Sequence, residues 1–180
     1  MKQLRQEDKI IDNVKKIHMI GIGGSGMCPL AEILHSKGYI LTGSDNNESD
    51  PLKRVKNLGI EVFMGHSASN VEGSELVVYS AAISKDNPEL VRAGELGIPT
   101  MERSHLLGAL TRKYENVIGV CGTHGKTSVT SMITQILILN KSSLQHFHQD
   151  CHLAGISHPL EYPFGPFLKR PLDIYFNHRR

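Results

Sequence analysis

The chain has 180 residues, 39% of them hydrophobic and 21% charged, which is enough for one domain of ordinary size or for one domain and part of another. A formal net charge of +2 is too small to indicate nucleic acid or a membrane surface as the partner. No apolar run is long enough for a signal peptide or a membrane span, and the three cysteines lack metal-type spacing. We therefore expect a protein of the reducing cytoplasm, with its oligomeric state left open.

Residues 16–103 alternate between short apolar runs and helical patterns, after a polar N-terminal extension over residues 1–15. Strands are expected over residues 17–20, 39–42, 60–63, 76–79 and 99–101. Helices are expected over residues 27–37, 51–58 and 88–96, the second of them capped by Asp50. Strands that alternate with helices of this length predict an α/β fold with a doubly wound, Rossmann-like parallel sheet.

A connecting helix and linker are expected over residues 104–116, and a second α/β domain is expected to begin behind them. Residues 117–139 have the order strand, glycine-rich loop and helix, with the strand over residues 117–121. One strand and one helix cannot bury a core of their own. We therefore expect these residues to be only the start of an incomplete domain.

Residues 140–180 show no helical or strand period and contain five of the ten histidines. Such a break in character is expected of an unrelated tail, either out of frame or disordered. Three of its histidines could be metal ligands: His146, His148 and His152. A solvated or poorly folded tail is the simpler hypothesis.

A G-x-G-x-x-G pattern, Gly21 to Gly26, lies between the first expected strand and helix. Its glycines permit a tight turn and let backbone N–H groups approach a diphosphate at the positive end of the helix. Asp45, after the second expected strand, has the position from which a carboxylate accepts from a ribose hydroxyl. The motif alone is weak, but its position between strand and helix favours a nucleotide-diphosphate site.

A second glycine-rich loop contains Gly122, Thr123, His124, Gly125, Lys126, Thr127 and Ser128. The common form G-x-x-x-x-G-K-[ST] would have glycine where this chain has Val120. The loop still has the groups that bind a nucleotide. Its backbone amides can wrap phosphate, Lys126 supplies a cation, and the Thr127 hydroxyl can bind Mg²⁺. The loop therefore predicts an ATP site with Lys126 and Thr127 as its catalytic residues, and the two loops together predict two nucleotides.

Over about residues 16–138 the sequence resembles the Mur ligases. The resemblance is carried by both glycine loops and by four further stretches in the family's order: Thr42-Gly43-Ser44-Asp45, Gly65-His66, Tyr79-Ser80-Ala81-Ala82-Ile83 and Asn87-Pro88-Glu89. His124 favours the branch that adds alanine, because the ligases for later amino acids usually look like G-T-N-G-K at this point.

The resemblance implies an enzyme of peptidoglycan precursor synthesis that joins L-alanine to UDP-N-acetylmuramate. The implied reaction uses ATP and Mg²⁺ to make an acyl phosphate of the muramate carboxylate, which the alanine amine then attacks. Residues 16–103 would bind the UDP-sugar and residues 117–139 would begin the ATPase domain. By position, the UDP-sugar contacts would come from Gly21, Gly23, Gly24, Ser25, Gly26, Asp45, His66 and Ser80.

Enzymes of this kind are more than twice as long, so the resemblance leads us to expect a truncated chain without ligation activity of its own. Two alternatives stay open. One is a stand-alone Rossmann module that binds or senses NAD or another nucleotide. The other is a fragment of the related ligase that recycles muropeptides onto UDP-muramate.

Overall fold

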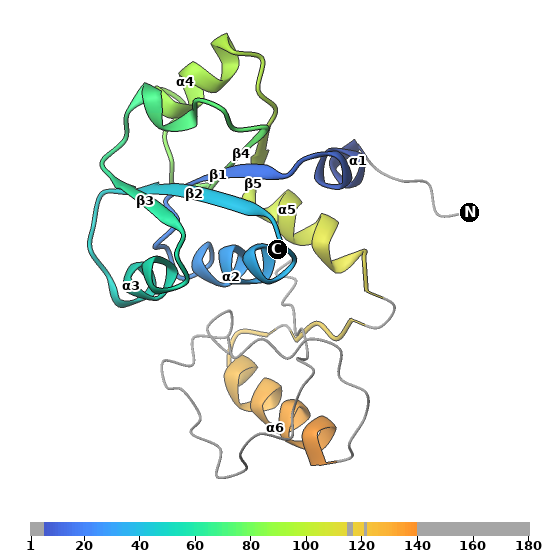
Figure 1. Cartoon of the computed structure of the whole chain (residues 1–180). Helices are drawn as coiled ribbons and strands as arrows, with labels where there is room; N and C mark the ends of the chain where they lie inside the picture. The colour runs from blue at the N-terminus through green and yellow to red at the C-terminus, as the bar shows by residue number, and fades with distance from the viewer. Residues whose placement is uncertain (1–5, 115–116, 121, 140–180) are drawn as a thin grey trace. The chain divides into compact units, whose positions relative to one another are not determined.

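The structure is a computed structural model that describes residues 6–114, 117–120 and 122–139 (Figure 1). The chain forms two compact units, Met1–Lys113 and Tyr114–Arg180. The two predicted nucleotide loops therefore belong to different units.

The first unit is built on a five-stranded sheet in the order β3-β2-β1-β4-β5, with every neighbouring pair parallel. Its strands are β1 (Lys16–Ile20), β2 (Ile40–Asp45), β3 (Glu61–Met64), β4 (Leu76–Tyr79) and β5 (Thr100–Glu102). The chain moves from β1 outward to β3 and then adds β4 on the other side of β1. The strand order thus reverses between β1 and β4, which confirms the predicted doubly wound, Rossmann-like fold.

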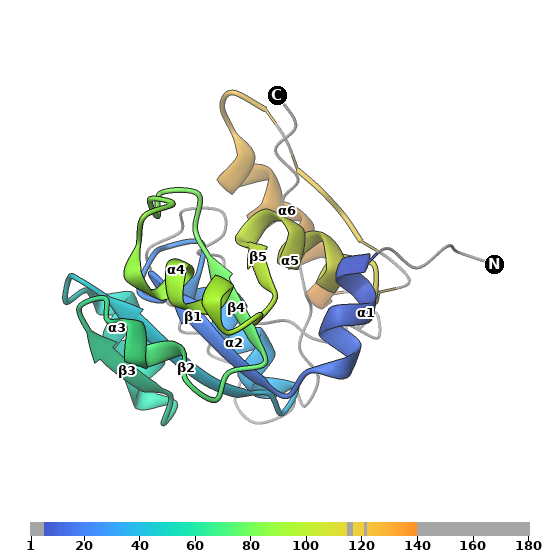
Figure 2. The same cartoon turned by 90° about the horizontal axis from the view of Figure 1, so that it is seen from above.

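Helices cover both faces of this sheet. Figures 1 and 2 show α2 (Cys28–Ser36) and α3 (Asp50–Asn57) on one face and α4 (Pro88–Glu95) on the other. The short 3-10 helix η1 (Ala68–Val71) packs with α4, and α5 (Arg103–Thr111) follows β5. The sheet is buried between these layers: Met19 and Ile20 of β1 and Val77 and Val78 of β4 are each 0% exposed.

The predicted strands and helices of the first unit are all present, with ends that differ by a few residues. The predicted cap of α3 is wrong by one position. Ser49, not Asp50, is the capping residue, because its Oγ accepts from the backbone N–H of Leu52 at 3.2 Å. Asp50 instead begins the helix, where a carboxylate is favoured by the helix dipole, and pairs with Lys53 at 3.2 Å.

The polar N-terminal stretch contains a helix that the sequence analysis did not predict, α1 (Gln6–Asn13). It packs with α5 and buries Ile11, which is 0% exposed. Arg112 pairs with Asp8 at 2.8 Å across the two helices. A helix with so few apolar side chains gives a weak periodic signal, because its stability comes from the helix on which it packs.

The second unit contains α6 (Lys126–Leu139), the helix predicted behind the second glycine loop. The strand predicted over residues 117–121 is wrong for residues 117–120, which form none, while Cys121 lies outside the described residues. The described part of this unit offers no neighbouring strand, and a strand needs one for its backbone groups. The predictions for residues 140–180, including the three histidines of the tail, also lie outside the described residues.

Candidate functional site

The predicted residues of the first site lie on loops that leave the carboxyl ends of four strands. Gly21 to Gly26 follow β1, Asp45 ends β2, His66 lies just beyond β3, and Ser80 directly follows β4. Parallel strands end at the same edge of a sheet, and the edge at which strand order reverses is where open α/β sheets bind ligands. The topology therefore brings all these residues to one edge.

The glycine loop is fastened to β2 by its first half. The backbone N–H groups of Gly21 and Ile22 donate to the Ser44 carbonyl at 2.8 and 3.1 Å. Gly23 donates its N–H to Asp45 Oδ2 at 2.9 Å, and a Cβ at Gly23 would lie 3.0 Å from that same oxygen. Glycine is required here because the loop backbone lies directly against the Asp45 carboxylate.

The second half of the loop presents unpaired backbone donors. Within the described residues the N–H groups of Ser25 and Gly26 donate no hydrogen bond, whereas the next two, of Met27 and Cys28, both donate to the Gly24 carbonyl at 2.9 Å. Ser25 is exposed and α2 begins at Cys28. Free N–H groups at the positive end of a helix can bind the oxygens of a diphosphate.

Arg103, the first residue of α5, lies against this loop and was missed by the sequence analysis. A Cβ at Gly26 would be 3.3 Å from the Cζ, Nε and Nη1 atoms of Arg103, so the guanidinium lies beside the loop backbone. A guanidinium in this position can pair with an anion that the loop binds. The one signal in the sequence was the position of this arginine directly after the last strand. Ordinary surface arginines also occur there, so the position alone does not indicate a site.

Asp45 uses both carboxylate oxygens to organise the site. Oδ2 accepts from the Gly23 N–H, and Oδ1 accepts from the Asn47 N–H at 3.0 Å. An ionised carboxylate offers about four lone-pair positions. Asp45 can therefore still accept from a ribose hydroxyl, while it also fixes the glycine loop.

His66 is bonded to the buried carboxylate of Glu89 in α4, a residue of the stretch Asn87-Pro88-Glu89 for which the sequence analysis predicted no role in the site. His66 Nδ1 lies 3.0 Å from Glu89 Oε2 and 3.1 Å from Ser44 Oγ. Ser44 donates its hydroxyl to the same Oε2 at 2.7 Å, and Asn70 Nδ2 donates to Oε1 at 2.6 Å. Glu89 is 0% exposed, so this is a carboxylate inside the protein with a full set of partners.

His18 of β1 lies on the other side of that carboxylate and is 0% exposed. Its Nδ1 is 2.8 Å from Thr42 Oγ1 and its Nε2 is 3.5 Å from Glu89 Oε1. Burial by itself raises the pKa of Glu89, but the polar contacts with His18, Ser44 and Asn70 outweigh burial and leave that pKa below its usual value. Glu89 is therefore held as an anion.

Ser80 takes part in a local turn. Its Oγ accepts from the Ala82 N–H at 3.2 Å, and its carbonyl accepts from the Ile83 N–H at 2.9 Å. Among the described residues it makes no hydrogen bond to the other predicted site residues. Its place beside Gly21 follows from the register, in which Tyr79 of β4 is opposite Ile20 of β1.

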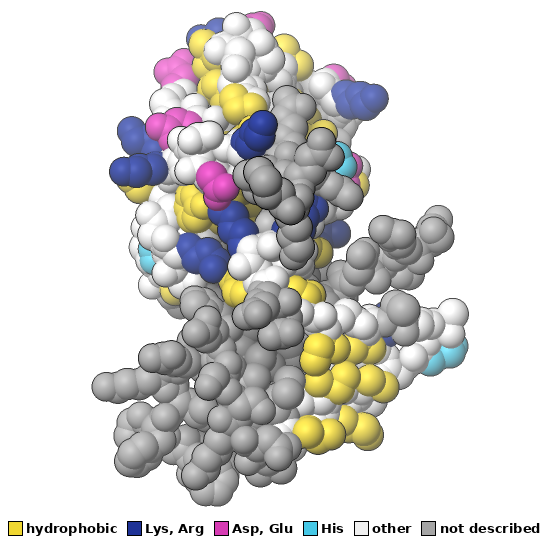
Figure 3. All heavy atoms as spheres, turned by 90° about the vertical axis from the view of Figure 1, so that its right-hand side faces the viewer, with side chains coloured by type: hydrophobic (Ala, Val, Ile, Leu, Met, Phe, Trp, Pro, Cys, Tyr) yellow, Lys and Arg dark blue, Asp and Glu magenta, His cyan; other side chains and the backbone are white. Residues whose placement is uncertain are grey.

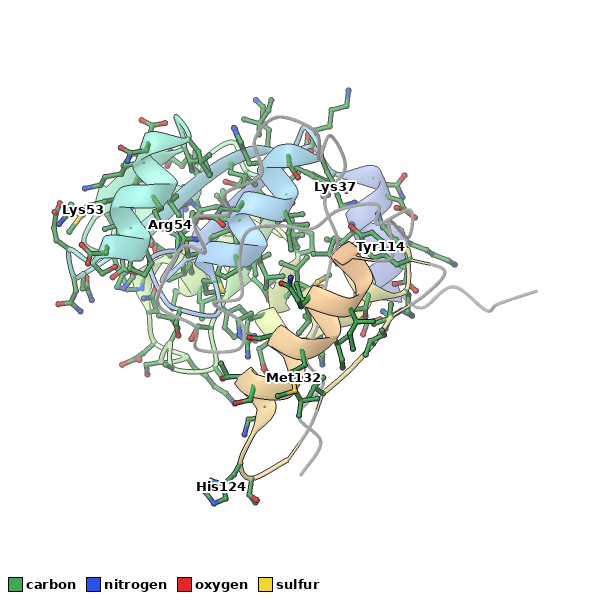
Figure 4. All side chains as sticks on the ribbon, turned by 90° about the horizontal axis from the view of Figure 1, so that it is seen from below. Lys37, Lys53, Arg54, Tyr114, His124 and Met132 are labelled. Carbon is green, nitrogen blue, oxygen red and sulfur yellow. The ribbon has the colours of Figure 1, made fainter. Side chains whose placement is uncertain are left out.

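The second predicted site is the loop that leads into α6. Lys126 Nζ donates to the Gly122 carbonyl at 2.6 Å and to the Thr123 carbonyl at 3.3 Å, so its ammonium group closes the loop. Gly125 has φ = 77°, a left-handed conformation that favours glycine. Figure 4 shows His124 at the tip of the loop. Thr127 and Ser128 occupy the first turn of α6, where N–H groups face an anion site.

One side of α6 is apolar and open. Val129, Met132 and Ile136 are 44%, 64% and 57% exposed. Figure 3 shows hydrophobic side chains gathered in the lower part of the view. No sheet in the described residues of the second unit supports this helix, although a phosphate loop depends on a firmly held strand and helix.

Two findings limit other kinds of site within the described residues. They contain no group of three or more His, Cys, Asp or Glu side chains that could hold a metal ion. They also contain no helix that combines the length and the apolar character needed to cross a membrane.

Comparison with known proteins agrees with these features. Residues 16–115 match the profile described as Mur ligase family, catalytic domain. UDP-N-acetylmuramate–L-alanine ligase from Sulfurihydrogenibium sp. is 50% identical over 124 residues, which are 69% of this chain and 27% of that protein. The chain thus spans about a quarter of the length of this relative.

Two solved structures share the fold. UDP-N-acetylmuramate-alanine ligase from Thermotoga maritima has a TM-score of 0.67 and 37% identity, over 73% of this chain and 31% of that one. UDP-N-acetylmuramate:L-alanyl-gamma-D-glutamyl-meso-diaminopimelate ligase from Neisseria meningitides also has a TM-score of 0.67, with 28% identity over 74% of this chain and 42% of that one. Because the profile covers more than half of the sequence, the chain belongs to the Mur ligase family.

Proposed function

We propose that the first unit binds UDP-N-acetylmuramate for the ATP-dependent addition of L-alanine, a step in peptidoglycan precursor synthesis. The observation that carries the proposal is that the N–H groups of Ser25 and Gly26 donate no hydrogen bond within the described residues, just before α2 and at the edge where strand order reverses. Relatives named for this reaction support the choice of ligand. Under this proposal the chain acts in the cytoplasm, where ATP is present.

Each predicted residue has a role in the proposed site. The N–H groups of Ser25 and Gly26, together with Arg103, bind the diphosphate. Asp45 accepts from the uridine end, and His66 and Ser80 face the nucleotide-sugar from the neighbouring loops. Gly21, Gly23 and Gly24 have no side chains that could block the approach of the ligand to the backbone.

We further propose that residues 122–128 bind ATP. Lys126 would exchange its contacts with the loop carbonyls for the β- and γ-phosphates, and the N–H groups at the start of α6 would face the same anion. The Thr127 hydroxyl, an oxygen donor of the kind that Mg²⁺ accepts beside phosphate oxygens, would supply one metal ligand. The ion neutralises phosphate charge when bound.

The assignment of domains is also a proposal. Residues 16–103 would form the UDP-sugar domain, 104–116 the connection and 117–139 the start of the ATPase domain. Since the matched region makes up only 27% and 31% of two relatives, these 180 residues would supply the nucleotide-sugar site without turnover. Helix α6, which no sheet of the described residues supports, would bind ATP weakly.

The alanine-adding branch is the favoured one. A ligase named for L-alanine is 50% identical to this chain over 124 residues. The ligase for the muropeptide L-alanyl-gamma-D-glutamyl-meso-diaminopimelate is 28% identical. The muropeptide-recycling reaction remains the second candidate because the same fold supports it.

Calorimetric titration of the 180-residue chain tests the proposed function. UDP-N-acetylmuramate is expected to bind and NAD to show no heat of binding, because the site is built for a nucleotide-sugar diphosphate. Addition of ATP, Mg²⁺ and L-alanine is expected to release no phosphate. Tighter binding of NAD than of the UDP-sugar would establish the sensing module instead, and measured ligation would contradict the expected lack of turnover.

Substitution of Arg103 by alanine is expected to raise the Kd for UDP-N-acetylmuramate by about 10- to 100-fold, because a charge-assisted hydrogen bond to the diphosphate is lost. Arg92→Ala is the matched control: Arg92 is a comparably half-buried arginine on α4, paired with Glu95 at 2.9 Å. Its Kd should equal that of the unmodified chain. An unchanged Kd for Arg103→Ala would remove Arg103 from the site.

A further inference from the structure

We propose that Glu89 is a positioning residue of the nucleotide-sugar site, which fixes Nδ1 as the protonated nitrogen of His66 and leaves Nε2 to meet the ligand. The inference rests on the proposed function for its ligand, but the assignment of the ring nitrogen rests on hydrogen-bond geometry alone. Glu89 itself does not contact the nucleotide-sugar and acts through the imidazole.

The proton on His66 Nδ1 follows from counting donors. Ser44 has a single hydroxyl hydrogen, which it donates to Glu89 Oε2 at 2.7 Å. The two groups near His66 Nδ1, Glu89 Oε2 at 3.0 Å and Ser44 Oγ at 3.1 Å, can then only accept. Nδ1 must therefore carry the hydrogen, shared between two acceptors.

The other ring nitrogen is free for a ligand. Among the described residues His66 Nε2 has no hydrogen-bond partner. It is also absent from the fully buried unpartnered atoms, so solvent can reach it. The side chain retains 14% exposure. Because Nδ1 is occupied inside the protein, the exposed part of the imidazole presents Nε2 at the carboxyl edge of the sheet.

The neighbours of this carboxylate make their own hydrogen bonds to the backbone on either side of the site. Asn70, which donates to Glu89 Oε1, donates as well to the carbonyl of Gly65, the residue before His66, at 3.3 Å. Ser44, which donates to Oε2, accepts through its carbonyl from Gly21 and Ile22 of the glycine loop. Glu89 is thus connected to each loop of the proposed site through one intervening residue, Ser44 or Asn70.

Glu89 is itself held rigidly and paired. Its backbone N–H donates to Asn87 Oδ1 at 2.9 Å, which caps α4. Two titratable groups face its carboxylate, His18 from β1 and His66 from the loop after β3, and the remaining partners, Ser44 and Asn70, are neutral. A buried carboxylate with this many donors retains one orientation, as a positioning group requires.

A double-mutant cycle in the 180-residue chain tests the proposal. Glu89→Gln and His66→Ala are made singly and together, and the Kd for UDP-N-acetylmuramate is measured for each. Glu89→Gln alone is expected to raise Kd about tenfold. The amide has only one oxygen acceptor, so it cannot accept from Ser44, His66 and Asn70 as the carboxylate does. In the His66→Ala background it should change Kd by less than about twofold, because its effect passes through the imidazole. Equal effects in the two backgrounds would overturn the proposal.

Ring-nitrogen NMR of His66 supplies a readout that a merely structural role would not produce. The neutral imidazole of His66 in the unmodified chain is expected to carry its hydrogen on Nδ1, and the Nε2–H tautomer would overturn the proposal. This spectrum needs no ligand, so it remains decisive even if the nucleotide-sugar does not bind. Asp8→Asn, which changes the buried carboxylate that pairs with Arg112, is the matched control and should leave both Kd and the His66 spectrum unchanged.

Discussion

Replacement of Gly43 by alanine is expected to destabilise the first unit by about 3 kcal/mol and to weaken nucleotide-sugar binding at the same time. A Cβ at Gly43 would lie 2.6 Å from Ile22 Cδ1 and 2.8 Å from Ile22 Cβ and Cγ2. Ile22 is 0% exposed and belongs to the glycine loop, so it cannot move without shifting the loop. The added methyl group therefore acts on stability and on the site through one contact.

Denaturant unfolding followed by circular dichroism, together with calorimetric titration, measures both effects. Gly94→Ala is the control, since Gly94 lies within α4 and a Cβ there would meet no atom within 4 Å. That substitution should stabilise the unit by about 0.5–1 kcal/mol, because alanine is the better helix former. If Gly43→Ala unfolds at the same denaturant concentration as the unmodified chain, the Ile22 side chain can move away without cost and does not hold the loop rigidly.

Gly43 also shows what the sequence could and could not predict. The motif Gly21 to Gly26 is local, and its position between a strand and a helix was enough to predict its conformation. The alternation of strands and helices likewise predicted the doubly wound sheet, because each crossover is short and right-handed. That position 43 must be glycine depends on Ile22, which reaches it only after β1 and β2 have paired.

Contacts that form only when distant segments pack together also explain why the role of Glu89 was not predicted. Asn87-Pro88-Glu89 has the pattern of a helix start, where an acidic residue is usually exposed. Only the packing of α4 on the sheet brings Glu89 against His18 and His66. In the second unit, residues 117–120 have the apolar run of a buried strand, yet a run of β-formers becomes a strand only where a neighbour pairs with it.

Substitution of Glu89 by leucine is expected to lower the free energy of unfolding by about 3–5 kcal/mol near neutral pH, the largest effect among the variants considered. Leucine leaves the Ser44 and Asn70 donors without their carboxylate acceptor and removes the charge that lies 3.5 Å from His18 Nε2. Asp86→Asn, at an exposed carboxylate three positions earlier, should leave the free energy nearly unchanged. Denaturant unfolding of the three proteins provides the comparison, and a Leu variant as stable as Asp86→Asn would show that the carboxylate contributes nothing to folding.

The dependence of that difference on pH identifies its cause. The pKa of Glu89 is lower in the folded chain than its usual value of 4.5, so the unfolded chain takes up a proton first as the pH falls. The stabilisation by Glu89 is therefore fully present above that value and is lost as the pH falls through the folded pKa.

Glu48, Glu75 and Asp86, whose pKa values are also lowered, are common to both proteins, and their contributions cancel in the difference. The gap between the unmodified chain and Glu89→Leu should thus narrow as the pH falls below about 4.5 and through the lower pKa of the folded chain. A gap of constant size would mean that the loss comes from misfit of the leucine side chain and not from the missing charge.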